Sequence, residues 1–404
     1  MARPLDVDRY RQNPGIPWAP LSADEIEARR IVKINAETVS DTAATDFPGH
    51  YGPQQDDSWD LERFSQNLNV DFHYNKPYDA AFSLVGVDAS IANAFRRILL
   101  AEIPTLAIED VFMFNNTSII QDEVLCHRLG LIPLTGGLEG LRNLRWYKKP
   151  APKDTFTMQS TSDEPEEEYP ASARTPNEHN TIVLTLDVEC RWKTEADDGV
   201  DGKKLAKDGI TDPEQRYVHS NVYASDLVFK PQAGQKDVFA GEDAIRPVNP
   251  EILIAKLRPG QVIHLQCHCY KGIGSDHAKF SPVATASYRL LPQITITKPI
   301  LGADAKKFAR CFPRGVIGYE TDAESGEQKA VVRDPMKDTV SRECLRHEEF
   351  KNRVKLGRVR DHFIFSIEST GQFESDELFL DSVRLLRAKA ETFKRHLDDL
   401  EEGR

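Results

Sequence analysis

Apolar residues recur at alternating spacings of four and three residues near the C-terminal end of the chain. That spacing is typical of one face of an α-helix, and Ser375, Asp376 and Glu377 are typical of a capped, acidic helix start. We therefore predict a helix from residue 375 to about residue 400, roughly 39 Å long at about 1.5 Å per residue. Its apolar face, which we call the C-terminal stripe, consists of Phe379, Val383, Leu386, Ala390, Phe393, Leu397 and Leu400.

This pattern has two interpretations. A single small domain covers a long rod with a narrow apolar face poorly, so the C-terminal stripe is a candidate dimerisation surface. Alternatively, the helix is amphipathic and packs on its own domain. The spacing alone leaves both open.

A second helix is predicted from residue 88 or 90 to Pro104, with Asp88 or Ser90 as its cap. Arg96 and Arg97 point away from its apolar face, and the pattern alone slightly favours a solvated face for them. The apolar face, which we call the first-helix stripe, consists of Ile91, Phe95, Ile98 and Leu99. Alternating apolar residues predict strands over residues 80–87, 108–115, 181–192, 261–270 and 363–367.

Polar stretches separate these elements. Residues 161–180, 195–215 and 231–250 are rich in acids, Gly or Pro and are predicted to be loops, which indicates a β-rich middle region with surface insertions. Residues 1–60 contain several prolines and few periodic apolar positions, so they are predicted to be an extension with one short helix near residues 22–32. The expected fold class is α+β.

Composition narrows the function. The 404 residues include 52 Lys and Arg against 64 Asp and Glu, a net charge of −12, which argues against a protein that coats DNA. No apolar run approaches the length of a signal peptide or a membrane span. The six cysteines are therefore expected to be reduced thiols in the cytosol or nucleus.

Two local clusters suggest other chemistry. Cys267 and Cys269, with His residues nearby, could belong to a zinc-dependent enzyme, but a strand would place these thiols and His268 on opposite faces, and the chain lacks a second Cys pair. Residues 351–360 hold five basic side chains and no acid, which fits a solvated strand edge, contact with an acidic partner surface or a nucleic-acid-binding module. Local catalytic signatures for a nucleophile or a phosphate cradle are missing.

Four blocks of sequence carry a resemblance. They are residues 90–104 (SIANAFRRILLAEIP), residues 107–133 with Glu109, Asp122, Glu123 and HRLGLIP, residues 276–288 (DHAKFSPV and Tyr288), and residues 363–371 (FIFSIESTG) before the long helix. In this order they resemble the alpha-like subunits of DNA-directed RNA polymerases, a family with archaeal members that also includes the third subunit of polymerase II. The resemblance is closest to the larger alpha-like subunit shared by eukaryotic polymerases I and III.

The resemblance implies a discontinuous dimerisation domain (residues 61–133 and 361–404), in which helices pack on an antiparallel sheet. A β-rich domain (134–292) and a small ferredoxin-like remnant (293–360) would be inserted between its parts, after the N-terminal extension (1–60). Residues 134–180 contain no Cys, and residues 293–360 contain only Cys311 and Cys344, so neither zinc nor an iron–sulfur cluster, nor any other cofactor, is expected.

The resemblance also implies a role. The chain would be a non-catalytic assembly scaffold in the nucleus, including the nucleolus, for polymerases that transcribe rRNA, 5S rRNA and tRNA. Its expected partners are a smaller alpha-like subunit in an obligate heterodimer, the second-largest subunits and two small zinc-bearing subunits, with little or no direct DNA contact. Arg96, Arg97 and Arg128 are the candidate contacts to larger subunits, and both stripes are the candidate dimerisation surface.

Overall fold

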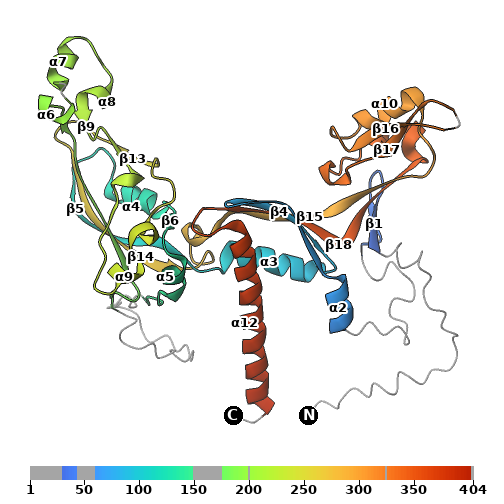
Figure 1. Ribbon diagram of the computed structural model, residues 1–404, viewed down its shortest axis with the longest axis horizontal. Coiled ribbons are helices and arrows are strands. Elements are labelled where there is room, and N and C mark those ends of the chain that lie inside the picture. Colours follow the sequence, from blue (N-terminus) through green and yellow to red (C-terminus); the bar gives the residue numbers. More distant parts are fainter. Residues whose placement is uncertain (1–29, 43–59, 149–174, 199–200, 324, 402–404) are drawn as a thin grey trace, which may run out of the picture. The chain divides into compact units, whose positions relative to one another are not determined.

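The computed structural model describes residues 30–42, 60–148, 175–198, 201–323 and 325–401 and shows a mixed α/β protein with antiparallel strand pairs and a long C-terminal helix (Figure 1). It divides into two compact units. Unit 1 contains residues 1–74, 81–93 and 287–366, and unit 2 contains residues 75–80, 94–286 and 367–404. None of the described helices combines the length and the hydropathy that a membrane span needs.

Unit 1 is built on a six-stranded sheet with the order β2-β1-β18-β4-β3, in which β15 also pairs with β18. Phe82 and Phe365 stack in its core with ring centroids 5.4 Å apart, and Tyr288 lies 5.3 Å from Phe365. The strands are β1 (Ile31–Ile34), β2 (Val39–Ser40), β3 (Asn69–Lys76), β4 (Asp79–Val85), β15 (Val283–Ile296) and β18 (Val354–Ser369), and some of them continue into unit 2.

Glycine is needed where β4 turns into the next helix. Gly86 has a φ of +81°, and a Cβ there would lie 2.3 Å from the carbonyl oxygen of Asn67. Its N–H donates to the Asp361 carbonyl at 2.9 Å. Asp88 then accepts from the Ser90 N–H at 2.8 Å, so Asp88 caps α3 (Ala89–Ala101) as predicted.

A second cluster in unit 1 contains Cys311 and Cys344 among apolar side chains. Phe308 and Phe350 meet at 5.3 Å in its centre. The elements around it are α10 (Gly302–Arg310), β16 (Ile317–Thr321), β17 (Gln328–Val332), η7 (Pro335–Lys337), η8 (Glu343–Arg346) and α11 (Glu348–Lys351), and α2 (Leu61–Asn67) also belongs to this unit.

Unit 2 is built on a four-stranded sheet with the order β11-β7-β14-β5. Its strands are β5 (Thr105–Asn116), β7 (Ile182–Glu189), β11 (Val228–Phe229) and β14 (Val262–Gly272). Three strand pairs accompany it, β6 (Leu134–Thr135) with β12 (Arg246–Pro247), β8 (Arg191–Trp192) with β9 (Tyr217–Val218), and β10 (Asn221–Tyr223) with β13 (Leu253–Lys256).

The helices of unit 2 are α4 (Asp122–Gly130), α5 (Leu138–Asn143), α6 (Glu195–Asp198), α7 (Gly202–Lys207), α8 (Pro213–Arg216), α9 (Gln235–Val238), the short η4 (Ala224–Asp226), η5 (Gly241–Asp243) and η6 (Ala278–Phe280), and α12 (Ser375–Glu401). Most of them are short. Five of them, α6, α7, α8, α9 and η5, lie in or at the end of the stretches that the sequence predicts as loops.

Several predictions need correction. The stretch at 195–215 contains three short helices rather than loop alone. Residues 31–34 are a strand, β1, so the predicted helix at 22–32 is wrong at its end, and its residues up to 29 lie outside the described part. The basic run at 351–360 is not at a free strand edge, because β1 pairs with residues 356–359 of β18 and β15 also pairs with β18.

Candidate functional site: the surface of α12

The first turns of α12 are fixed within unit 2. The Ser375 N–H donates to the Pro77 carbonyl at 2.9 Å, and Leu378 is fully buried. Phe379 meets the ring of Phe95 on α3 edge-on, with ring centroids 5.4 Å apart. This contact joins the two predicted stripes at one point.

Ion pairs continue this attachment along the helix. Arg142 of α5 lies 3.2 Å from the Glu377 carboxylate and 3.0 Å from that of Asp381. Lys389 pairs with Glu102 at the end of α3. All these side chains are partly exposed, so each pair contributes about 1 kcal/mol or less to stability, and their main effect is to fix the direction of α12.

The first-helix stripe is covered by this chain itself. Phe95, Ile98 and Leu99 are buried, and Ile91 is half-buried. We expected a partner to cover these side chains, whereas the structure already covers most of them internally. Their role in dimerisation stays a prediction. In that prediction they act mainly by packing against the base of α12 rather than by contacting a partner.

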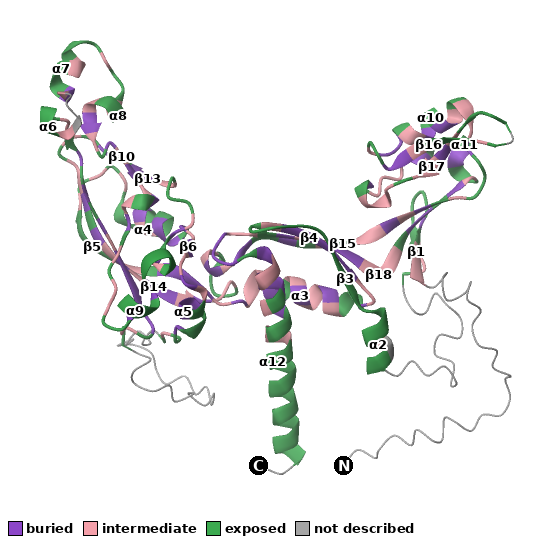
Figure 2. Cartoon of the chain, in the orientation of Figure 1, coloured by how far each residue is buried: buried purple, intermediate pink, exposed green. Residues whose placement is uncertain are grey.

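The C-terminal stripe is different, because most of its residues after Phe379 are exposed. Leu386 is half-buried and Ala390 is exposed, and every described residue from Arg387 onward is exposed (Figure 2). The exposed fractions are 40% for Val383, 67% for Phe393, 45% for Leu397 and 73% for Leu400. Burying roughly half of each of these four side chains would contribute about 3–6 kcal/mol.

The opposite face of α12 is suited to water. Arg387 pairs with Glu391 one turn later at 2.8 Å, and Arg384 pairs with Asp381 at 2.6 Å. Such pairs are typical of a solvated helix face. The helix therefore has one face built for solvent and one apolar face that the described residues leave uncovered.

The three candidate arginines differ in their surroundings. Arg128 donates to the backbone carbonyls of Leu253 at 2.8 Å and Ile254 at 3.2 Å, so it fastens α4 to β13. Arg96 is half-buried, and Arg97 is exposed. The structure does not bring the three together, and Arg97 is the most accessible of the α3 pair.

Two of the motif blocks, residues 107–133 and 276–288, meet at Lys279. Its side chain is largely buried, donates to the Ile108 carbonyl at 2.8 Å and pairs with Glu109. A Cβ at Gly130 would lie 3.4 Å from the Ile108 carbonyl oxygen and 3.6 Å from the Lys279 side chain. These motif residues therefore hold the fold together around the end of α4.

Sequence reasoning missed Gln372. This buried side chain accepts from the Leu106 N–H at 3.0 Å and donates to the carbonyls of Leu106 at 3.2 Å and Leu134 at 2.6 Å. It thus links β5, β6 and the segment that leads into α12. The only sequence signal for this role is the position of Gln372, a polar residue directly after the FIFSIESTG block.

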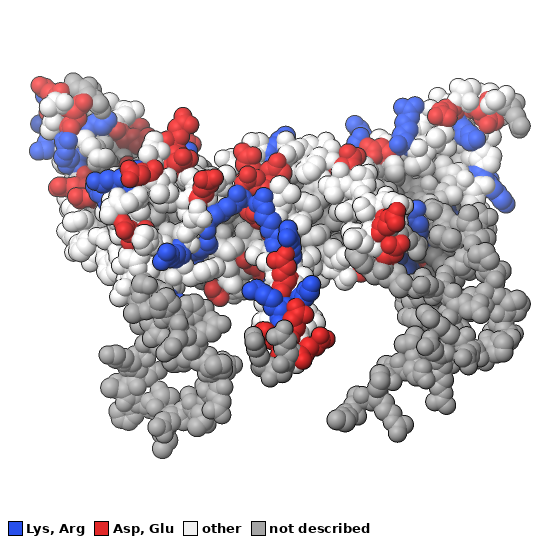
Figure 3. Space-filling model, turned by 60° about the horizontal axis from the view of Figure 1, so that its bottom comes forward, with Lys and Arg blue, Asp and Glu red and all other residues white. Residues whose placement is uncertain are grey.

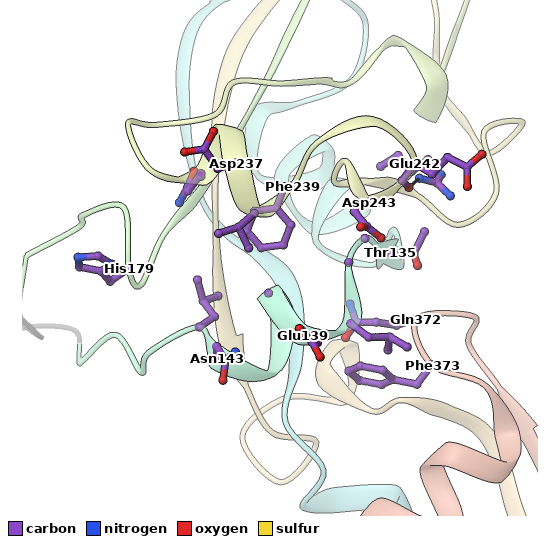
Figure 4. A pocket seen from close by; sticks show the side chains of 18 of the residues that line it. Thr135, Glu139, Asn143, His179, Asp237, Phe239, Glu242, Asp243, Gln372 and Phe373 are labelled. Carbon is purple, nitrogen blue, oxygen red and sulfur yellow. Dashed lines mark hydrogen bonds between the residues drawn. The ribbon is translucent and has the colours of Figure 1, made fainter.

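Beside Gln372 lies a cavity of about 1070 Å³ within unit 2 (Figure 4). Acidic side chains, including Glu139, Asp237 and Asp243, line it together with Phe239. The lining therefore combines carboxylates with the Thr135 hydroxyl group, the His179 imidazole and an aromatic ring.

The zinc interpretation has little support. Cys267 and Cys269 are fully buried on the inner face of the sheet, and burial raises the pKa of Cys267 to about 12 and the pKa of Cys269 well above its ordinary value. Zinc binds the thiolate form, which such burial disfavours. Among the described residues, no three His, Cys, Asp or Glu side chains are placed to share a metal ion.

The basic run at 351–360 is largely engaged within unit 1. Lys351 pairs with Glu348 at 3.2 Å, Arg353 pairs with Asp304 at 3.5 Å, and Arg360 donates to the Asp41 carbonyl. Lys355 and Arg358 are exposed. On the face drawn in Figure 3, acidic and basic side chains are interspersed, which is unlike a nucleic-acid-binding stripe.

Comparison with known proteins identifies the class. Residues 81–390 match the family described as the RNA polymerase Rpb3/Rpb11 dimerisation domain. The chain therefore belongs to this family of RNA polymerase subunits, and the resemblance that its sequence motifs indicated is confirmed.

Individual relatives refine this picture. The chain is 46% identical over 365 residues to the DNA-directed RNA polymerases I and III subunit RPAC1 of Saccharomyces cerevisiae, which covers 90% of this chain and 97% of that protein. The human protein of the same name is 44% identical over 372 residues, covering 92% and 96% of the two chains. Subunit 3 of DNA-directed RNA polymerases II, IV and V of Arabidopsis thaliana is 28% identical over 329 residues, covering 80% and 89%.

Proposed function

We propose that this chain is the larger alpha-like subunit shared by RNA polymerases I and III, a non-catalytic scaffold that acts in the nucleus, including the nucleolus. It serves transcription of rRNA, 5S rRNA and tRNA, and catalysis belongs to other chains of the polymerase. The observation that carries the proposal is the exposed C-terminal stripe of α12 in a member of a dimerisation-domain family. The high identity to subunits named for polymerases I and III supports the choice of polymerases.

The partner of α12 in this proposal is a smaller alpha-like subunit. Its own apolar helix would cover Val383, Leu386, Phe393, Leu397 and Leu400, while the ion pairs of Lys389 and Arg142 hold α12 in place. The first-helix stripe supports the base of α12 through the contact between Phe95 and Phe379. In this proposal dimerisation uses the apolar face that α12 already exposes, and the chain does not need to change its conformation.

The same proposal divides the chain as its sequence suggests. Residues 61–133 and 361–404 form the dimerisation domain, 134–292 the inserted β-rich domain and 293–360 a ferredoxin-like remnant without a cluster. The shared core of Cys311 and Cys344 with Phe308 and Phe350 supports the remnant, because these thiols are packed as apolar groups. The exposed Arg97 is the leading candidate for contact with a second-largest subunit, and two small zinc-bearing subunits complete the assembly.

Co-expression with the smaller alpha-like subunit tests the proposal. We expect the wild-type chain to co-purify with it in equal amounts, and we expect the variant with Leu386→Asp and Phe393→Asp to lose it, because each change forces a carboxylate against apolar side chains. Ala388→Asp adds the same group on the opposite face of α12 and should retain the partner. Retention of the partner by the double variant would refute the dimer model.

A further inference from the structure

Two histidines in unit 1 share one buried hydroxyl group. The Oγ of Ser83 lies 2.9 Å from the Nε2 of His73 and 2.7 Å from the Nε2 of His362. Ser83 is buried, whereas His362 is half-buried and His73 is exposed. The three side chains belong to β3, β4 and β18, so their two hydrogen bonds link three strands of the six-stranded sheet. We call them the His–Ser–His clasp.

The clasp joins the end strand of the sheet to strands further in. β3 is the last strand in the order β2-β1-β18-β4-β3, and every one of its residues is exposed. Contact between the rings of Phe72 and Phe82, whose centroids lie 5.1 Å apart, also fixes β3 to β4. A strand with so little buried surface has a low local stability, so a few side-chain contacts decide how firmly it is held. Loss of the clasp should therefore loosen β3 before the inner strands.

The number of protons on the two imidazoles decides whether the clasp can form. A hydroxyl group donates one hydrogen bond, and an imidazole Nε2 either accepts a bond or donates one. If at most one histidine is charged, Ser83 accepts from one imidazole and donates to the other. If both are charged, both Nε2 atoms are donors and the Ser83 proton has no acceptor within the clasp. The two cations would also lie within 5.6 Å of each other, the sum of the two hydrogen-bond lengths, and would repel each other.

The surroundings of the clasp direct the first proton to His73. Burial lowers the pKa of His362, Asp361 opposes this effect, and the charges of His73 and Arg30 reinforce it. Asp361 is itself paired with Arg30 at 3.1 Å, so its carboxylate is partly neutralised. His73 is exposed on the end strand, where water can solvate its charge.

Other charged groups beside the clasp do not favour a second proton. Three of them line the hollow that the exposed clasp histidine also lines, and two lie two residues before a clasp histidine, on the same face of β3 or β18. Two are acids and three are bases, namely Asp71, Asp334, Arg289, Lys337 and Arg360. Lys337 and Asp334 pair with each other at 3.1 Å. The set as a whole is therefore slightly positive.

We propose that the His–Ser–His clasp is a pH-sensitive switch that holds β3 on the sheet. The clasp is closed while the two histidines carry at most one added proton between them, which is their state at neutral pH. Binding of the second proton opens it, breaks both hydrogen bonds to Ser83 and releases the end strand. This switch lies within unit 1, and it does not depend on which partner α12 binds.

Titration of the histidines by NMR tests the proton count. The full chain is labelled at the Cε1 of histidine, and the signals of His73 and His362 are assigned from the single variants His73→Gln and His362→Gln. We expect the titration midpoint of His362 to rise by about 1 pH unit in His73→Gln, because the competing charge is gone. His264→Gln removes an exposed histidine of unit 2 and should leave that midpoint unchanged. The same His362 midpoint in wild type and in His73→Gln would overturn the inference.

Hydrogen exchange of the backbone amides tests the release of β3. Ser83→Ala removes the shared hydroxyl group, and we expect residues 69–76 of this variant to exchange about tenfold faster than wild type at pH 7, as is typical when buried hydrogen bonds are lost. Ser366→Ala removes a half-buried hydroxyl group of β18 and should exchange as the wild type does. Equal exchange of β3 in Ser83→Ala and wild type would show that the clasp does not hold this strand, and the inference would fail.

The pH dependence of exchange in the wild type supplies the last readout. Rates are measured from pH 7 down to about pH 4.5 and corrected for the intrinsic effect of pH on amide exchange. We expect β3 to lose its protection at a higher pH than β7 of unit 2, because the second proton opens the clasp before the rest of the chain responds. Loss of protection in both strands at the same pH would overturn the inference.

Discussion

The substitution Phe393→Asp isolates the contribution of the C-terminal stripe. Phe393 is 67% exposed in this chain, so a partner that covers it recovers about two thirds of a phenylalanine burial, or about 1–2 kcal/mol. The variant loses that gain and also places an unpaired carboxylate in an apolar contact, which costs about 3–5 kcal/mol when no relief is available. Even with partial relief, we expect a loss of about 3 kcal/mol or more, a dissociation constant at least about a hundredfold weaker.

The assay is titration calorimetry or fluorescence anisotropy with the purified smaller alpha-like subunit. Phe393 makes few contacts within its own chain, so the free energy of unfolding of the isolated variant should stay within about 0.5 kcal/mol of wild type. Ala388→Asp, on the opposite face, should bind as the wild type does. A dissociation constant for Phe393→Asp within about threefold of wild type would refute the reasoning, since no covering surface could tolerate that charge.

Three further predictions concern stability and reactivity. Gln372→Leu leaves buried backbone groups of β5 and β6 unpaired and should lower the free energy of unfolding in urea by at least about 2 kcal/mol; an unchanged midpoint would contradict this. Burial lowers the pKa of His362 in the folded state, with Asp361 opposing, so the unfolded state binds more protons and stability should fall as the pH drops below about 6.5. His362→Gln should flatten that dependence between pH 8 and 5, and an identical slope in the variant would exclude His362 as its source. Cys267 and Cys269 should be unreactive toward a thiol reagent until the chain unfolds, and rapid native labelling at either position would argue against their burial.

Features governed by local chemistry were predictable from the sequence. The start of α12 at Ser375 and the cap of α3 at Asp88 follow from side chains within a few residues of each helix end. The strand β7 follows from the apolar residues at every second position, Ile182, Leu184, Leu186 and Val188, all of which are buried. In each case the sequence pattern and the structure-forming interaction lie in the same short segment.

Features governed by distant partners were not predictable. β1 exists because it pairs with β18, more than 300 residues away, and nothing within residues 31–34 reveals that partner. Arg128 has an ordinary position on α4, and its carbonyl acceptors belong to β13. The burial of Phe95 likewise depends on where α12 begins.

The sheet order of unit 1 affects how the protein is made. β4 ends at Val85 and its partner β18 begins at Val354, so 353 − 85 = 268 residues lie between them. At a synthesis rate of about 5–20 residues per second, β4 waits roughly 13–54 s on the ribosome before β18 is made. An unpaired strand edge is open to aggregation throughout that interval. Because α12 follows β18 directly, the C-terminal stripe is synthesised only after β18, so a chain that lacks the closing strand of this sheet also lacks the surface that we propose for dimerisation.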